Sequence, residues 1–365
     1  MSLGLPSISI TFKSVANKTS QLGIRGIVAL ILKDATHNGA NIYTTAKDVQ
    51  SDLSEANQEQ IKLALIGGLN ADDTPAVPQK VIAFIEPADA ADYSAAMTYF
   101  GGVKWDYLAV PGIAASDVTA VATWVEALRD QQHKRVKAVL PNSASDHEGI
   151  INFVTDGIKV DDTTYSAADY CARIAGILAG IPLTIASTYQ VLPEVTSIPV
   201  ETDDQLNADI AAGKLILFTD VDKIRIARGV NSLTTLTAGK GADFQKIKLV
   251  AIMDRIYSDI EQTAHDSYIG KVPNDYDHKC ILISAINSYL AILAQNSILD
   301  PNATNAIEID TDAQKEWLTG QGVDTGSIKE LQIKEYNTGT NVFLKGDITP
   351  VDAMEDISLS FTLGV

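Results

Sequence analysis

The chain has 365 residues, a hydrophobic fraction of 46%, a mean hydropathy of +0.07 and a formal net charge of −18 at pH 7. This length and composition predict a well-packed globular protein of two or three domains. The acidic surplus argues against nucleic acid and anionic membranes as partners, because both would repel the chain.

The cysteines and the lack of sorting patterns indicate a cytosolic origin. Cys171 and Cys280 both fall in helical patterns, and we expect small buried hydrophobes there instead of a disulfide. The N-terminus lacks the basic start and apolar core of a secretory signal. The most apolar window, residues 174–186, is interrupted by glycine and proline and is too short to span a bilayer. We therefore expect folding in a reducing cytosol and no membrane insertion.

Each end of the chain carries one short alternating segment. The apolar positions are Ile8, Ile10 and Phe12 near the N-terminus, and Ile357, Leu359, Phe361 and Leu363 near the C-terminus. A lone strand is not stable in water, so each segment must join a sheet. Two interpretations remain open. The two strands pair inside one domain, or they add to the sheets of neighbouring subunits by strand exchange.

The pattern between these ends divides the sequence into five parts. An N-terminal arm over residues 1–20 precedes a small N-terminal region over residues 21–87. Residues 88–237 alternate strands with helices, which predicts an α/β middle domain with a mostly parallel sheet. Residues 238–349 predict an α+β C-terminal domain, and residues 350–365 form a C-terminal arm.

The first half of the chain has clear start and stop signals. In the small region we expect strands at residues 24–32 and 81–85 around a helix at residues 54–66. In the middle domain, strands are expected at residues 105–110 and 136–140. A helix at residues 116–132, capped by Ser116, is expected between them.

Further along the middle domain, the sequence predicts a hairpin over residues 151–160. Ser166 has the spacing of a helix cap for an Ala/Gly-rich helix that ends near residue 179. Leu215 to Phe218 form a fully apolar strand, and an alternating strand follows at residues 223–228.

The C-terminal domain has a different pattern from the middle domain, with longer helices and no alternation of strands and helices. Long amphipathic helices are expected at residues 244–268 and 277–295, followed by a hairpin with strands at residues 328–336 and 341–348. Two strands alone make a marginal sheet. We therefore expect the exchanged terminal strands to complete this sheet.

None of the candidate catalytic motifs in the sequence is complete. The Gly-rich segment at residues 238–241 lacks the spacing of a phosphate-binding loop, and there is no nucleophile elbow. The clusters at residues 146–148 and 275–278 could bind a metal, but helix capping or solvation explains them better. Arg225 and Arg228 could bind an anion or could be exposed strand charges. We predict no catalytic residue, cofactor or metal.

Several stretches resemble contractile phage tail sheath proteins, a family that includes the sheaths of R-type bacteriocins. They are W-D-Y-L-A-V-P-G from Trp105, A-D-Y-C-A-R-I-A-G-I-L-A-G from Ala168 and R-I-A-R-G-V-N-S-L-T-T from Arg225. The resemblance continues into the helix expected at Phe244 and the terminal strand, and it covers most of the chain.

The resemblance implies a structural protein with a subtilisin-like middle domain that lacks catalytic groups. Members of the family assemble with themselves as stacked hexameric rings around a tail tube, anchored on a baseplate and closed by a tail terminator. Contraction drives the tube through a bacterial envelope. The subunit would assemble in the bacterial cytoplasm and end in a virion tail or a released bacteriocin particle.

Residues that contact the tube protein are harder to choose. We expect them on the polar face of the first long helix, at Lys248, Arg255, Asp259 and Gln262, although this face could equally contact solvent or a neighbour. An R-type bacteriocin or type VI-like sheath fits the resemblance as well as a phage sheath does. The alternative from another functional class is a soluble α/β hydrolase or nucleotide-binding enzyme. Such an enzyme would have a pocket with polar groups that converge at the strand ends.

Overall fold

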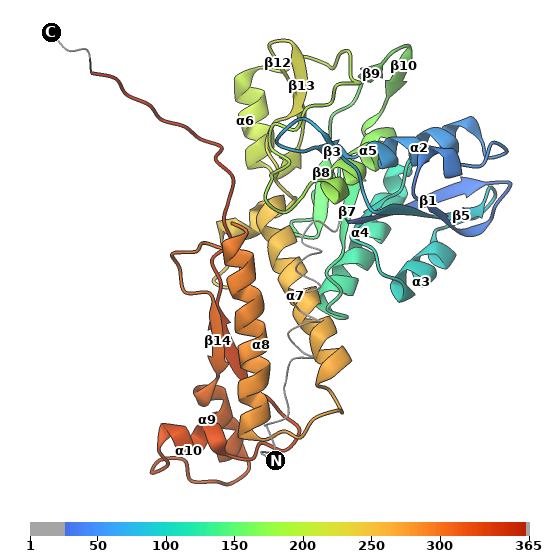
Figure 1. The fold of residues 1–365 in the computed structure, drawn as a ribbon. Coiled ribbons are helices and arrows are strands. Elements are labelled where there is room, and N and C mark those ends of the chain that lie inside the picture. The colour runs from blue at the N-terminus through green and yellow to red at the C-terminus, as the bar shows by residue number, and fades with distance from the viewer. Residues whose placement is uncertain (1–25, 363–365) are drawn as a thin grey trace, which may run out of the picture. The chain divides into compact units, whose positions relative to one another are not determined.

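The computed structural model describes residues 26–362, which divide into two compact units (Figure 1). The α/β unit contains residues 26–254 and 352–362 of this range. The C-terminal unit contains residues 255–351. The boundary between them falls inside one long helix.

A seven-stranded sheet forms the centre of the α/β unit. Its order is β11 (Lys214–Leu215), β8 (Ile150–Phe153), β7 (Lys137–Pro141), β6 (Tyr107–Ala109), β1 (Ile27–Asp34), β5 (Lys80–Pro87) and β2 (Gly39–Tyr43). All neighbouring strands are parallel except β2, which pairs antiparallel with β5. The predicted α/β fold class with a mostly parallel sheet is confirmed.

The expected small region over residues 21–87 shares this sheet with the expected middle domain. Strand β1 lies between β5 and β6, and its side chains from Ile27 to Leu32 are buried. A strand that is apolar on both faces needs cover from both sides. The single helix of residues 21–87 covers one face only, so β1 depends on helices that follow later in the chain.

Four helices cover the two faces of the sheet. Helices α2 (Glu55–Ile66) and α5 (Ala167–Gly180) bury Val28 and Leu30 on one face. On the opposite face, α3 (Ser94–Gly102) and α4 (Ala115–Asp130) bury Ala29 and Ile31. Figure 1 shows α2 and α3 on opposite sides of β1 and β5.

Of the two caps predicted for these helices, the one at Ser166 is confirmed: its side chain accepts a hydrogen bond from the first turn of α5. Ser54, which was not predicted as a cap, does the same for α2. The cap at Ser116 is wrong: α4 begins after Ala114, and the Ser116 hydroxyl hydrogen-bonds the Asp117 carboxylate.

Short two-stranded sheets complete the unit: β3 (Gly68–Leu69) with β4 (Pro75–Ala76), β9 (Ile158–Val160) with β10 (Thr163–Tyr165), and β12 (Leu217–Asp220) with β13 (Lys223–Ile226). The predicted hairpin over residues 151–160 is therefore wrong. The first half of that segment belongs to β8, which is fully buried and pairs with β7 in the main sheet. The apolar strand at Leu215 is also divided, because the chain changes sheets at Ile216.

Helix α6 (Asp203–Ala211) was not predicted, because it buries none of its residues and so has no apolar stripe. Its signal was the capping box between Thr202 and Gln205. Single 3₁₀ turns occur at Ala46–Asp48 and Ala242–Gln245.

The C-terminal unit is built on helices. Helix α7 (Ile247–Ser267) enters it from the α/β unit, and α8 (Tyr276–Gln295), α9 (Thr311–Gly320) and α10 (Glu330–Glu335) follow. Its sheet pairs β14 (Ala306–Ile309) with β15 (Leu344–Asp347) in antiparallel fashion. Both predicted long helices are present. Cys171 is buried as expected, whereas Cys280 is exposed, since it lies off the packed side of α8.

The predicted hairpin at residues 328–336 and 341–348 is wrong in its first strand. Residues 330–335 form α10, because Ile333 is fully buried against α9 and its carbonyl oxygen accepts from the Gln314 side chain. The second strand is correct in place, but its partner is β14, which was not predicted.

Close packing of α5 on its neighbours gives a stability test. A Cβ atom at Gly180 would lie 1.9 Å from the Ala76 carbonyl oxygen, whereas one at Gly101 in α3 would meet nothing within 4 Å. We expect Gly180→Ala to lower the free energy of unfolding by about 1–3 kcal/mol through overpacking. Gly101→Ala should leave it unchanged or raise it by up to about 1 kcal/mol. Urea unfolding measures both, and equal stability of the two variants would contradict the packing.

Candidate functional site

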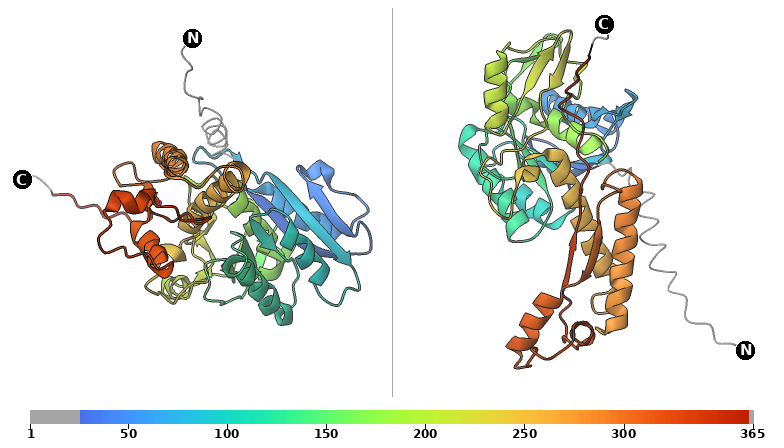
Figure 2. Two further views of the ribbon diagram at one scale, coloured as in Figure 1. Left: turned by 90° about the horizontal axis from the view of Figure 1, so that it is seen from below. Right: turned by 90° about the vertical axis from the view of Figure 1, so that its left-hand side faces the viewer.

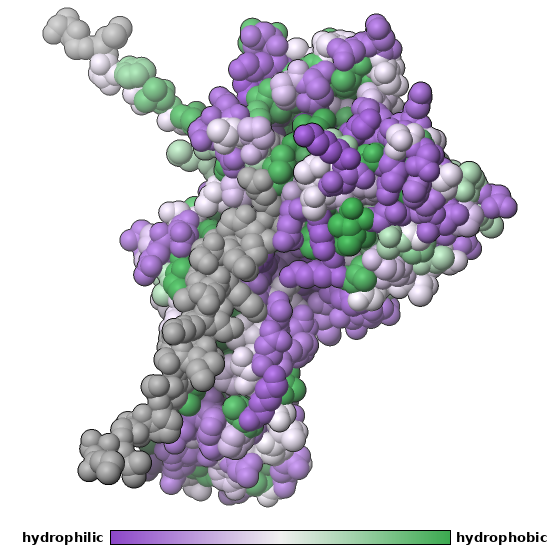
Figure 3. Space-filling view, turned by 45° about the vertical axis from the view of Figure 1, so that its right-hand side comes forward, coloured by the Kyte–Doolittle hydropathy of each residue, from purple (hydrophilic) through white to green (hydrophobic). Residues whose placement is uncertain are grey.

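The C-terminal arm is the most exposed apolar segment that the structure describes. Ile357, Leu359 and Phe361 are 83%, 72% and 82% exposed, and residues 351–362 belong to no helix or strand. Figure 1 shows this segment running extended away from the α/β unit, and the left view of Figure 2 also shows it extended. In the space-filling view, hydrophobic atoms follow one another along it at the upper left (Figure 3). The arm therefore has the form of a strand without a sheet.

The other predicted arm positions lie outside the described residues. These are Leu363 at the C-terminus and Ile8, Ile10 and Phe12 at the N-terminus. Their part in subunit contacts stays a prediction.

The base of the arm is held by charges, which we call the arm anchor. Arg228 forms ion pairs with Asp356 at 2.7 Å and with Glu355 at 3.4 Å. Lys246 pairs with Asp352, and the Thr188 hydroxyl donates to Glu355. Hydrogen bonds to Asp356 and Asp352 raise the pKa values of Arg228 and Lys246. The anion that Arg228 binds is thus the chain's own arm.

Arg225, the other arginine considered for anion binding, has local partners. Its Nε lies 2.8 Å from the Asp220 carboxylate, across the turn of the same hairpin. One of its terminal nitrogens donates to the Tyr189 carbonyl oxygen, and its guanidinium lies 5.6 Å from the centre of the Tyr189 ring. Arg225 therefore stabilises the β12–β13 hairpin.

The R-G-V-N-S sequence that follows β13 joins three loops. The Gly229 amide donates to Thr188, and a Cβ at this position would lie 2.4 Å from the Ser187 hydroxyl. The Asn231 side chain donates to the Phe244 carbonyl oxygen at 2.7 Å, ahead of α7. The Ser232 hydroxyl donates to the His147 carbonyl oxygen at 2.9 Å. These contacts explain the sequence pattern without any ligand.

A buried ion cluster fixes the first half of α7 to the sheet. Asp254 accepts from Arg129 at 2.9 and 3.0 Å and from Lys137 at 2.6 Å, and all three side chains are less than a tenth exposed. Burial raises the pKa of Asp254, but the charges of Lys137 and Arg129 outweigh it and leave the pKa lowered. The carboxylate of Asp254 is therefore paired with two cations inside the protein.

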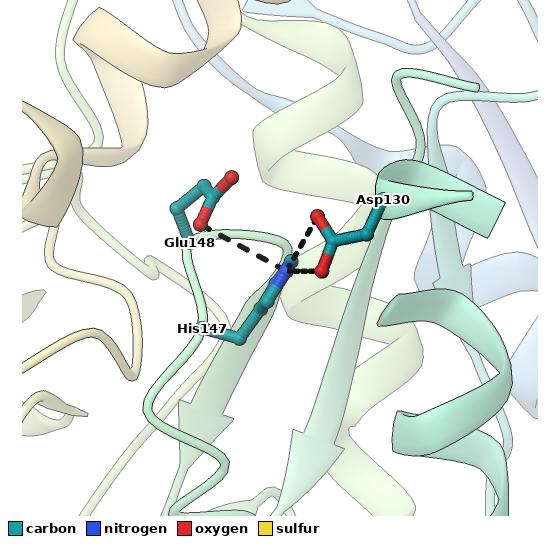
Figure 4. Close-up of side chains that lie close together, drawn as sticks. All are labelled: Asp130, His147 and Glu148. Atoms are coloured by element: carbon teal, nitrogen blue, oxygen red, sulfur yellow. Dashed lines mark hydrogen bonds and ion pairs between the residues drawn. The ribbon is translucent and has the colours of Figure 1, made fainter. Parts of the chain in front are cut away.

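Residues 146–148, which the sequence offered as a candidate metal site, form capping hydrogen bonds and ion pairs. Asp146 accepts from the Thr234 and Thr235 amides at 2.6 and 2.8 Å. His147 Nε2 lies 3.4 Å from Asp130 and 3.9 Å from Glu148, which is the group drawn in Figure 4.

Three contacts use the donor atoms that this group could offer to a metal. His147 Nδ1 accepts the Gly149 amide at 2.9 Å. Glu148 pairs with Lys240 at 2.8 Å and lies 3.6 Å from Arg129. Two cations therefore already neutralise the carboxylate that a metal would need.

The second candidate, residues 275–278, is a helix cap. The Asp275 side chain accepts from the His278 amide at 2.9 Å and lies 2.6 Å from His278 Nδ1. This is the capping role that the sequence predicted for Asp275.

Acidic side chains at the carboxyl ends of β1 and β5 also serve as structural acceptors. Asp34 accepts from the Ser54 amide at 3.0 Å and from the Asn57 side chain at 2.7 Å. Glu86 accepts from the Ala96 amide at 2.7 Å in the first turn of α3. The acidic groups at these two strand ends therefore form structural hydrogen bonds.

The four predicted tube-contact residues do not share one open face. Lys248 and Asp259 are each 8% exposed. Within the C-terminal unit, Asp259 accepts from Arg255 at 2.8 Å and from the α8 residue Tyr289 at 2.9 Å. Only Gln262 is exposed. A contact of these residues with the tube stays a prediction, because the spacing places charges on a helix face but does not tell whether a second helix covers that face.

Among residues 26–362, no helix is long and apolar enough to cross a membrane.

Comparison with known proteins defines the class. The family model "Phage tail sheath protein central domain" matches residues 86–232, and "Phage tail sheath C-terminal domain" matches residues 239–364. The chain belongs to the phage tail sheath protein family, whose members are components of phage tails and other contractile injection systems.

Individual relatives agree with this assignment. The tail sheath protein of Clostridium phage phiCD119 is 41% identical over 360 residues, which is 98% of both chains. The sheath tail protein Lin1278 of Listeria innocua has a similar structure, with a TM-score of 0.72, 18% identity and coverage of 96% and 97%. A sheath complex of an extracellular contractile injection system in the contracted state gives a TM-score of 0.67 at 14% identity, with coverage of 93% and 92%.

The buried cluster gives a test of stability against pH. Asp254→Ala leaves two buried cations without their carboxylate and should lower the free energy of unfolding by about 3–5 kcal/mol. Because its folded-state pKa is lowered, Asp254 stabilises the wild type above the usual carboxyl pKa of about 3.9, and this contribution is lost as the pH falls below it. Denaturant unfolding between pH 3 and 7 measures both effects. The exposed control Asp89→Ala should change little, and an equal loss there would contradict the assignment.

The arm anchor gives a second test. A spin label on Met354→Cys, in a Cys280→Ser background, reports the mobility of the anchored segment. We expect Arg228→Gln with Lys246→Gln to increase label mobility severalfold, since partly exposed ion pairs are each worth about 0.2–1 kcal/mol. The control Arg225→Gln loses its pair with Asp220 and its contacts with Tyr189 but no contact with the arm, so it should leave the spectrum unchanged. Equal spectra for all three proteins would rule the anchor out.

Proposed function

We propose that this chain is the repeating subunit of a contractile sheath. It assembles as stacked hexameric rings around a tail tube and is attached to a baseplate and a tail terminator. Contraction then drives the tube through a bacterial envelope. The observation that carries the proposal is the extended C-terminal arm, whose three apolar side chains are exposed in a chain of the sheath family.

Strand exchange is the linkage that this arm suits. A segment with apolar residues at every second position covers one face of a sheet when it is added as a strand. Five added residues form a handful of backbone hydrogen bonds, each worth about 0.5–1.5 kcal/mol net. Burial of Ile357, Leu359 and Phe361 adds about 1.5–3 kcal/mol for each side chain. Such a joint would keep subunits connected while their globular surfaces slide.

A helical sheath requires contacts that do not close on themselves. An arm that leaves one subunit and enters the next provides such a contact. The N-terminal arm would provide a second one through Ile8, Ile10 and Phe12. The acidic surface repels nucleic acid and does not oppose a tube of complementary charge.

We propose a structural role without catalysis, cofactor or metal. Contraction needs no bound nucleotide if the extended sheath is kinetically trapped and the contracted one buries more surface. The subunit would assemble in the bacterial cytoplasm and then form part of a virion tail or a released R-type bacteriocin particle.

Arm variants test the proposal. In negative-stain microscopy we expect the full chain to form striated tubes or rings. We expect a chain with Leu359→Ser and Phe361→Ser to remain monomeric, because its arm no longer has an apolar face. The matched control Ser358→Ala with Ser360→Ala keeps that face and should still polymerise. Polymers formed in normal yield by the Leu359→Ser, Phe361→Ser variant would contradict the proposal.

A further inference from the structure

The arm anchor holds the arm against a surface that the α/β unit fixes by itself. Its cations Arg228 and Lys246 lie on two segments that are bonded to each other. Val230 and Lys246 form a β-bridge, and the Ile247 amide donates to the Gly229 carbonyl oxygen at 3.0 Å. The backbone of the α/β unit therefore sets the positions of both cations, whether or not the arm is bound to them.

A third cation lies beside the same carboxylates. Lys248, in the first turn of α7, is 8% exposed. Burial lowers the pKa of Lys248, and the charges of Asp352 and Glu355 act in the opposite direction. The anchor thus sets three cations against three carboxylates, which are Arg228, Lys246 and Lys248 against Asp352, Glu355 and Asp356.

Polar contacts are nearly all that holds residues 352–356. None of their side chains is buried, and Met354 and Asp356 are 94% and 86% exposed. The segment belongs to no helix or strand, and none of its amides donates to a backbone carbonyl within residues 26–362. Partly exposed ion pairs are individually weak and are screened by salt. The hold on this segment therefore depends on ionic strength.

The anchor also decides how much of the arm is free. While residues 352–356 are held, the free part that the structure describes is residues 357–362, which span at most about 20 Å. The next contact along the chain is the Val351 amide, which donates to the Ile298 carbonyl oxygen at 2.9 Å. Once the anchor opens, residues 352–362 are free and span up to about 36 Å. Opening the anchor therefore nearly doubles the reach of the arm.

We propose that the arm anchor is an electrostatic latch that gives the C-terminal arm two lengths. The arm is short while Arg228 and Lys246 hold residues 352–356, and it is long after salt releases them. The consequence for the polymer rests on the proposed sheath function. There, the latch sets the distance at which an arm connects two subunits, and it opens before that distance can increase.

Distances between two spin labels test the latch in the dilute monomer. The labels are placed on Thr123→Cys in α4 and on Ser358→Cys in the arm, both exposed positions, in a Cys280→Ser background. We expect a narrow distance distribution at about 0.01 M salt and one at least twice as wide at about 1 M, where screening acts over about 3 Å. Arg228→Gln with Lys246→Gln should give the wide distribution at both salt concentrations, and the control Arg225→Gln should behave like the parent chain.

A reversed ion pair separates charge from shape. Arg228→Glu alone places a third carboxylate beside Glu355 and Asp356 and should give the wide distribution at low salt. Adding Asp356→Arg restores an attraction and should narrow the distribution again. Widths that do not change with salt or with these variants would overturn the latch, as would a reversed pair that fails to narrow the distribution.

The spacing of subunits is measured separately, in polymers viewed by electron microscopy at low salt. The parent chain and Arg225→Gln should show one sharp axial repeat, whereas Arg228→Gln with Lys246→Gln should show a longer or variable one. The same sharp repeat in all three would overturn the role of the latch in spacing. A chain that never polymerises would overturn the proposed sheath function, and the label distances would still decide the latch.

Discussion

Unpaired backbone groups are the constraint on which this molecule depends. A strand reaches stability only when its amide and carbonyl groups are bonded and its apolar side chains are covered. Within residues 26–362, the C-terminal arm meets neither condition. The α/β unit is therefore complete in its core but leaves this apolar segment without a sheet.

The interior of the α/β unit explains how such exposed elements can be tolerated. The sheet is covered on both faces, α5 approaches its neighbours closely through Gly176 and Gly180, and α7 is fixed to the sheet by Asp254. The arm anchor at Arg228 and Lys246 then sets where the arm leaves this rigid unit. A strand that must find an acceptor on another subunit loses less conformational entropy when its base is already held.

Much of the fold could be predicted from the sequence, because the spacing of apolar residues and the residues that cap helices are local signals. The parallel sheet, the helices of its two faces and the exposed terminal arm all follow from such patterns. Three features could not be predicted from such patterns, because each depends on contacts between residues that are distant in the sequence. Residues 330–335 form a helix because Ile333 packs on α9, Asp259 is buried because Tyr289 reaches it from α8, and the edge of β14 is closed because Asn287 lies beside it.

Hydrogen exchange resolved to single amides, in dilute monomer and in sedimented polymer, tests the central claim most directly. In the monomer, the amides of residues 357–362 should exchange rapidly, since no partner within residues 26–362 covers them. In the polymer, alternate amides of the arm should become protected. If the polymer forms while these amides still exchange as in the monomer, subunits are held by their globular surfaces, and strand exchange is not the linkage.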